Sequence, residues 1–139
     1  MSTFENIRTW LYTILNGAIT YNGTAVAVYS IAPTNAAYPH VVIGDMELVP
    51  ANLNKECDIY DVSCEIIAVT KYTGVMATYK AADSIADDVL SKILNTTVKI
   101  SNYELLMTLL SRRNTTVEQI DTGYIITHKI VINFKIEGE

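Results

Sequence analysis

The sequence predicts an α+β fold: a mixed, mainly antiparallel sheet flanked by two helices, with a long C-terminal β-hairpin. Two segments, one at the N-terminus and one at 79–93, repeat apolar residues at the three- and four-residue spacing of an amphipathic helix. Other segments, above all 124–136, alternate with the two-residue period of a strand. The 139 residues suffice for one core, so we expect 1–139 to be a single domain.

Ser2 and Glu5 have the spacing of a capping box, which predicts the start of the first helix. The apolar stripe that follows consists of Phe4, Ile7, Leu11 and Ile14. We expect the helix to end near Gly17. Trp10 lies at the edge of this stripe. It is expected in the core, and a contact with another subunit is the alternative because tryptophan is enriched at interfaces.

The next third of the chain predicts two strands and a loop. An Asn-Gly turn at 22–23 precedes an expected strand at 25–31. A Tyr-Pro pair opens a second strand at 38–43, because the residue before proline is extended and proline suits the first position of a strand. We expect Gly44-Asp45 to stop this strand. Residues 46–54 contain proline and asparagine and are expected to form a loop.

A long strand is expected at 56–72. Its predicted core side consists of Tyr60, Val62, Cys64, Ile66 and Ala68. The other side is polar at first and apolar later, which indicates that a helix or a neighbouring subunit covers the second half. Ile67 and Val69 are therefore candidate subunit-interface residues.

The second helix is the clearest in the sequence. Its apolar stripe consists of Tyr79, Ala82, Ala86, Val89 and Ile93, and its outer face of Lys80, Asp83, Asp87, Asp88 and Lys92. We expect the stripe to lie on the sheet and the charges to be solvated.

The last third predicts a hairpin in which 105–119 pairs with 124–135 around an Asp-Thr-Gly turn. A strand of about 14 residues is roughly 45 Å long, which should outrun the core of a small domain. The polar end, 112–122, would then project.

Composition bounds the function. Hydrophobic residues make up 50% of the chain and charged ones 18%, with a mean hydropathy of +0.22, which favours oligomerisation. A net charge of −5 argues against an electrostatic grip on nucleic acid. We find no signal peptide and no membrane span. Cys57 and Cys64 fall in one expected strand, roughly 23 Å apart, so two reduced thiols are expected.

Residues for catalysis are sparse, so we expect no enzyme, cofactor or metal site. His40 and His128 stand alone and are expected to be structural or on the surface. Asp61 and Glu65 share a strand face but lie about 13 Å apart, too far for a carboxylate pair. The alternative is a small dimeric α+β enzyme or ligand-binding domain, which would have to use Asp61, Glu65 and His128.

The order of elements resembles the tail completion, or tail terminator, family of tailed bacteriophages. Its members start with an amphipathic helix and a strand and then carry a Tyr-Pro-hydrophobic-Gly-acid segment, here 38–45. A long strand, a helix with small apolar residues (here 79–82) and a closing hairpin follow. The aromatic-Ser ending of the long strand is missing, and 66–69 stands there instead. This departure leaves another phage neck or ring protein as an alternative.

The resemblance implies a ring, commonly a hexamer and alternatively a dodecamer, that caps the tail tube and joins it to the head connector or stopper. It implies a place at the head–tail interface of the virion, in the host cytoplasm during assembly, with DNA only as passing cargo and no membrane contact. The end of the hairpin would contact neighbouring rings through Arg112, Arg113, Thr116, Glu118 and Gln119. Trp10, Ile67 and Val69 would serve the subunit interface. A salt-bridged or solvated position is the alternative for Arg112 and Arg113.

Overall fold

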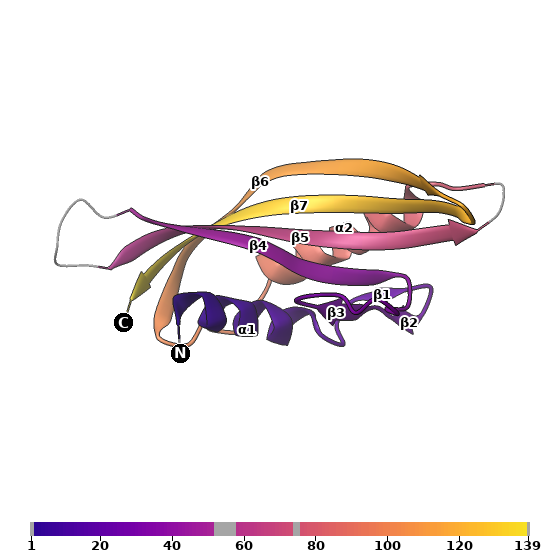
Figure 1. Cartoon of the computed structure of the whole chain (residues 1–139). Helices are drawn as coiled ribbons and strands as arrows, with labels where there is room; N and C mark the ends of the chain where they lie inside the picture. Colours follow the sequence, from indigo (N-terminus) through magenta and orange to yellow (C-terminus); the bar gives the residue numbers. More distant parts are fainter. Residues whose placement is uncertain (1, 52–57, 74–75, 139) are drawn as a thin grey trace.

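The computed structural model describes residues 2–51, 58–73 and 76–138. The elements, in chain order, are α1 (Thr3–Leu15), β1 (Thr20–Tyr21), β2 (Thr24–Ala25), β3 (Ala27–Tyr29), β4 (His40–Pro50), β5 (Ile59–Thr73), α2 (Lys80–Leu94), β6 (Tyr103–Ile120) and β7 (Gly123–Gly138). Five strands form one long sheet in the order β3-β4-β5-β7-β6, flanked by the two helices (Figure 1). Every neighbouring pair in this sheet is antiparallel except β3 with β4. The predicted α+β class is confirmed.

Helix α1 begins at the predicted capping box. The Ser2 hydroxyl accepts a hydrogen bond from the Glu5 N–H at 3.1 Å, and the Glu5 carboxylate accepts one from the Ser2 N–H at 3.0 Å. Trp10, further along the helix, is only 3% exposed. Its ring meets Phe134 edge to face, with centroids 5.2 Å apart, and its Nε1 donates to the Val98 carbonyl at 2.8 Å. Of the two roles left open for Trp10, the structure shows core packing.

The segment expected as one strand at 25–31 is divided into two short pieces. β1 and β2 form a small two-stranded hairpin of their own, and β3 then joins the main sheet beside β4. The predicted Asn-Gly turn is confirmed, because Asn22 and Gly23 have positive φ angles of 51° and 77°. Positive φ at both central residues is what a tight type I′ hairpin turn requires.

Strand β4 is longer than predicted. Gly44 and Asp45, which we expected to stop the strand, form a β-bulge in which both residues oppose Glu65. A bulge adds a residue without ending the pairing, so 46–50 continue as strand and the loop prediction is wrong there. A Cβ on Gly44 would lie 3.3 Å from the Glu65 carbonyl oxygen, a tight approach that explains the glycine. Residues 52–54 of the expected loop lie outside the described residues.

The core lies between the two helices and the side of the sheet that they cover, as the strand alternation predicted. The predicted core side of β5 is buried from Val62 to Ala68, with Tyr60 partly buried beside it. Helix α2 buries its predicted stripe, although Tyr79 precedes the helix and is exposed. The last strand contributes the most. Its buried side chains on this side are Ile126, His128, Ile130, Ile132, Phe134 and Ile136.

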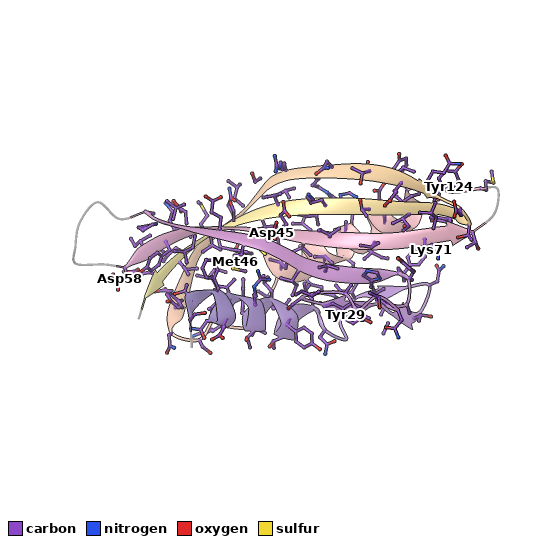
Figure 2. The ribbon with its side chains drawn as sticks, in the orientation of Figure 1. Tyr29, Asp45, Met46, Asp58, Lys71 and Tyr124 are labelled. Carbon is purple, nitrogen blue, oxygen red and sulfur yellow. The ribbon has the colours of Figure 1, made fainter. Side chains whose placement is uncertain are left out.

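β6 and β7 form the predicted hairpin, with its turn at 121–122. The prediction that the polar end projects is wrong. β5 pairs with β7 along its whole length, ending with Thr73 opposite Gly123, so the sheet supports the hairpin up to its turn (Figure 1). Lys71 and Tyr124 accordingly lie together at this end of the sheet (Figure 2). The prediction compared the hairpin with a small core, whereas β5 itself has 15 residues.

Candidate functional site

Among the residues that the structure describes, no helix packs on one side of the sheet, and we call this side the open face. Side chains alternate between the two sides of a sheet, so the strand registers show which residues share it. The open face carries Val42, Glu47 and Val49 of β4; Asp61, Ser63, Glu65, Ile67 and Val69 of β5; Lys129, Val131, Asn133 and Lys135 of β7; and Met107, Leu109 and Arg112 of β6. It is a mixed surface of apolar and charged side chains.

Ion pairs and one hydrogen bond cross the centre of the open face. Lys129 Nζ lies 3.6 Å from Glu65 Oε1, and Lys135 Nζ lies 3.8 Å from Asp61 Oδ1. Next to them the Ser63 hydroxyl donates to Asn133 Oδ1 at 2.6 Å. Exposed pairs of this kind contribute little to stability. Asp61 and Glu65 are each paired with a lysine and do not form a two-carboxylate site.

The open face is hollowed towards the end of the sheet where β4 leads into 51–58. A hollow of about 330 Å³ there is lined by residues from all four long strands, from Val49 on β4 to Met107 and Leu109 on β6. These three apolar side chains are unusually exposed, at 49%, 50% and 54%. A second hollow of about 220 Å³ lies between Asp45 and Arg112. Side chains of all four long strands therefore enclose one hollow on this face.

The sheet has two strand edges that no neighbouring strand covers within the described residues. β3 pairs with β4 only at 40–42, which leaves 44–50 uncovered on that side. The opposite edge is β6, the last strand in the sheet order. Edge strands present unpaired N–H and C=O groups that can accept another strand. At the start of the uncovered part of β4, Arg8 Nη1 donates to the Ile43 carbonyl at 3.2 Å, and Arg8 and 30–32 line a hollow together with Gly44 and Asp45.

On the helix-covered side, a network of charged side chains ties α2 to the hairpin. Arg113 Nε donates to His128 Nε2 at 2.9 Å, and Arg113 Nη2 donates to Asp87 Oδ1 at 2.6 Å. His128 Nδ1 lies 2.7 Å from Asp83 Oδ1. Because Nε2 accepts from Arg113, the ring N–H that donates to Asp83 is on Nδ1. We call these four residues the helix–hairpin network.

This network corrects two predictions. Asp83 and Asp87 were expected to be solvated on the outer face of the helix, but both bind residues of the hairpin. Arg113 was expected near a projecting end, but it lies midway along β6 and takes the salt-bridged alternative. Part of the signal was available in the sequence: two aspartates one helical turn apart on the second helix, and a His among the inward positions of the last strand.

The other predicted contact residues are distributed over two places, the open face and the region near the hairpin turn. Arg112 is exposed on the open face. Thr116, whose hydroxyl is hydrogen-bonded to that of Thr127, and Glu118 and Gln119 are exposed nearer the hairpin turn. Ile67 and Val69 lie on the open face and are half-buried. Arg112 therefore lies with Ile67 and Val69 on the open face, whereas Arg113 and Trp10 lie on the helix-covered side.

The residues named for the enzyme alternative do not converge. Asp61 and Glu65 lie on the open face, whereas His128 lies on the opposite side against α2. The described residues contain no group of three or more His, Cys, Asp or Glu side chains able to hold a metal ion. Nor does any helix among them have the length and apolar character to cross a membrane.

The thiol of Cys64 is not a reactive group. Its side chain is fully buried, and burial raises the pKa of the thiol to about 12, so almost no thiolate exists near neutral pH. Cys64 is free, as the sequence predicted for it. Cys57 lies outside the described residues, so the expected pair of reduced thiols is tested only at Cys64.

Comparison with known proteins places the chain in a family. The model of a family described as tail completion protein gp17 matches residues 5–136. The chain belongs to this tail completion family. A chain in a structure of the virion of a native gene transfer agent particle shares the fold, with a TM-score of 0.65 over 97% of this chain and 91% of that one. Their sequences are 16% identical. No curated protein matches the chain in sequence.

Membership in this family gives the coarse function. The tail completion protein is a structural component of a phage-like virion, of the tail or neck class. The open face, the two sheet edges and the polar residues near the hairpin turn are the candidate surfaces for contact with other virion proteins.

Proposed function

We propose that this tail completion protein forms a ring at the head–tail junction, where it caps the tail tube and joins it to the head connector or stopper. The observation that carries the proposal is the family match, which spans residues 5–136 and so nearly the whole chain. In this proposal 1–139 is one tail-terminator-like domain without catalytic function, and six copies form the ring. DNA passes through the lumen only as cargo, and the protein reaches the virion from the host cytoplasm.

The distribution of surfaces supports a ring. A ring requires a head-to-tail interface, in which two different patches of each subunit meet and the rotation closes. This chain has different edges on the two sides of one sheet, β6 on one side and 44–50 on the other. It also exposes large apolar side chains close to both edges, among them Val49 and Leu109.

We assign the remaining contacts by position. Thr116, Glu118 and Gln119, which are exposed near the hairpin turn, would meet the neighbouring ring along the axis of the tail. Ile67 and Val69, half-buried on the open face, would become covered in the assembled ring. Trp10 has no place in this interface because its side chain is already buried inside the subunit.

Electron microscopy and light scattering of the purified protein, alone and mixed with tail tubes, test the proposal. We expect annular particles of six subunits, free or only at tube ends, and capped tubes that no longer elongate. A ring of twelve subunits would correct the stoichiometry alone. A protein that stays monomeric or dimeric at every concentration and leaves tube ends bare would refute the proposed function.

A further inference from the structure

We propose that neighbouring copies join edge to edge, with β6 of one copy pairing antiparallel with 44–50 of the next. We call the two segments the β6 edge (residues 105–112) and the β4 edge (residues 44–50). The inference rests on the ring proposed above, and it names the surfaces that close that ring. The joined strands would form one continuous sheet around the lumen.

Strand direction is the first argument. In a ring whose axis runs along the strands, rotation leaves the strand directions of every copy unchanged. Three successive antiparallel pairings, β4 with β5, β5 with β7 and β7 with β6, make β6 run opposite to β4. The β6 edge of one copy therefore meets the β4 edge of the next in the antiparallel sense, which is slightly more stable per residue than the parallel one.

The second argument is the position of the two edges along the strand direction. Following the register across the sheet, Met107 pairs with Lys135, Lys135 with Asp61 and Asp61 with Val49. Met107 and Val49 thus lie at the same level and both point to the open face. By the same path Leu109 is level with Glu47. Rotation without axial displacement brings these level residues of two copies side by side.

Complementary chemistry at this level is the third argument. Met107 and Leu109 on the β6 edge are 50% and 54% exposed, and Val49 on the β4 edge is 49% exposed. Long exposed apolar edges are the ones that pair with another chain. The β4 edge carries Asp45 and Glu47 but no Lys or Arg, and the β6 edge carries Arg112 but no Asp or Glu.

Arg112 and Asp45 complete this match. The register places both opposite the same part of the sheet, since Arg112 pairs with Val131, Val131 with Glu65, and Glu65 faces the bulge at Asp45. Neither Arg112 nor Asp45 has an ion-pair partner among the residues that the structure describes. Across the joined edges each would be the other's partner.

The fold also limits where pairing can occur. β3 already covers β4 at 40–42, so a neighbouring strand reaches β4 only beyond that point. On β6, bulges interrupt the pairing with β7 between Leu105 and Met107 and between Leu110 and Arg112. Between these bulges the strand is regular, and this short stretch lies level with 46–49. The pairing is thereby limited to this short stretch of each strand.

Disulfide trapping between singly substituted chains tests the pairing. Val49→Cys and Met107→Cys are made as separate proteins in a Cys57→Ser background, mixed, assembled and oxidised. Directly opposite residues have Cα atoms about 4.5–5.5 Å apart, within disulfide range. We expect covalent dimers in the mixture and none from either variant alone. Within one chain the two strands are about 14 Å apart, and each chain carries one engineered cysteine, so no internal bond competes.

Two controls make the result decisive. A mixture of Val49→Cys with Thr116→Cys, which is also on β6 but far from this level, should give no covalent dimer. Rings that are visible by electron microscopy but show no Val49–Met107 cross-link would overturn the edge pairing and leave the proposed function intact. Dimers from Val49→Cys alone would also overturn it, because they indicate a symmetric contact. Absence of both rings and cross-links would refute the proposed function together with this inference.

A matched pair of charge substitutions gives a second readout. Met107 and Val117 lie on the same strand and are 50% and 46% exposed, but Val117 is level with Thr70, beyond the end of β4. We expect Met107→Glu to abolish rings and Val117→Glu to leave them, with both variants folded by circular dichroism. Rings from Met107→Glu with unchanged stability on dilution would contradict the pairing.

Discussion

Arg112 and Arg113 are adjacent in the chain but point to opposite sides of the sheet, and their substitutions should have different effects. Arg113→Ala leaves the buried Nε2 of His128 without its donor and breaks the ion pair with Asp87. Such a loss costs about 1–3 kcal/mol of the free energy of unfolding. Arg112→Ala removes an exposed side chain and should change it by less than about 0.5 kcal/mol. Urea denaturation of the two variants measures the difference.

Ring assembly, in contrast to subunit stability, should depend more on Arg112 than on Arg113. Arg112→Glu is expected to weaken ring formation without unfolding the subunit, because its proposed partner Asp45 is acidic. The double variant Arg112→Glu/Asp45→Arg should restore assembly by exchanging the charges. Light scattering over a dilution series measures both. If the single variant assembles as well as the unsubstituted protein, Arg112 is not an interface residue.

Cys64 predicts a specific dependence of stability on pH. Burial raises the pKa of its thiol to about 12 in the folded protein, whereas an unfolded cysteine titrates near its ordinary value of about 8.5. The thiol stays protonated to higher pH in the folded state than in the unfolded state. The free energy of unfolding is therefore unaffected below about pH 8.5 and falls as pH rises towards about 12, by up to about 1.4 kcal/mol per pH unit. Below this window the thiol should also resist alkylation.

Comparison of two variants isolates this effect from the tyrosines and lysines that titrate in the same range. We expect Cys57→Ser to lose about 2 kcal/mol more stability between pH 8 and pH 10 than Cys57→Ser/Cys64→Ala does. Urea denaturation at the two pH values gives the numbers. An equal loss in both variants, or rapid alkylation of native Cys57→Ser at pH 8, would show that Cys64 is not buried as described.

At the scale of elements, the periodicity of apolar residues predicted most helices and strands. Residues that usually end a strand led to a wrong boundary for β4. The two helices and the alternating faces of β5 and β7 follow directly from their apolar spacing. The second half of β4 was missed because Gly44-Asp45 is normally a stop signal and Pro50 a strand breaker. Its pairing with β5 is a tertiary interaction, and Pro50 is tolerated because it ends β4 at an uncovered edge.

The candidate site was less predictable than the fold. Which of Arg112 and Arg113 faces α2 depends on the bulge between Leu110 and Arg112, which shifts the alternation of β6 by one residue. No residue-level pattern announces such a bulge. Which strands lie at the open edges depends on the strand order, and that order is set by pairings between distant segments of the chain. Ile67 and Val69, by contrast, could be placed on one face of the sheet from the alternation of a single strand.

The hairpin turn provides a test of an element. Gly123 has φ +154°, and a Cβ there would lie 1.8 Å from the Tyr72 carbonyl oxygen on the neighbouring strand. Gly123→Ala should therefore separate the end of β7 from β5 and cost more than about 3 kcal/mol. Gly17 is the matched control, with φ +76° and no atom within 4 Å of the position of a Cβ. Gly17→Ala should cost only about 1–2 kcal/mol of backbone strain.

Thermal and urea denaturation of the two alanine variants distinguish clash from strain. Hydrogen exchange adds the location, since Gly123→Ala should expose the amides of the last residues of β5 and the first of β7. Similar destabilisation of both variants would mean that the two strand ends can separate at little cost.

At the scale of the whole molecule, the two sides of the sheet differ in what they would present to a lumen. The open face has no helix packed on it among the described residues and carries the hollow that all four long strands line, so we expect it to face inwards when copies join at their edges. The charged side chains given above for the open face balance, with Glu47, Asp61 and Glu65 against Arg112, Lys129 and Lys135, so this face would not attract phosphates as a basic lumen does. Purified rings are expected not to shift double-stranded DNA in a gel at low salt.

Two matched charge reversals test which side faces the DNA. Glu65 lies on the open face and Asp88 on α2, their side chains are 25% and 28% exposed, and each is paired with one lysine. Rings of Glu65→Lys should acquire salt-sensitive DNA binding, because every copy adds positive charge to the lumen. Rings of Asp88→Lys should acquire much less. The reverse order would place the helices at the lumen, and DNA binding by the unsubstituted rings would contradict the passive passage of DNA.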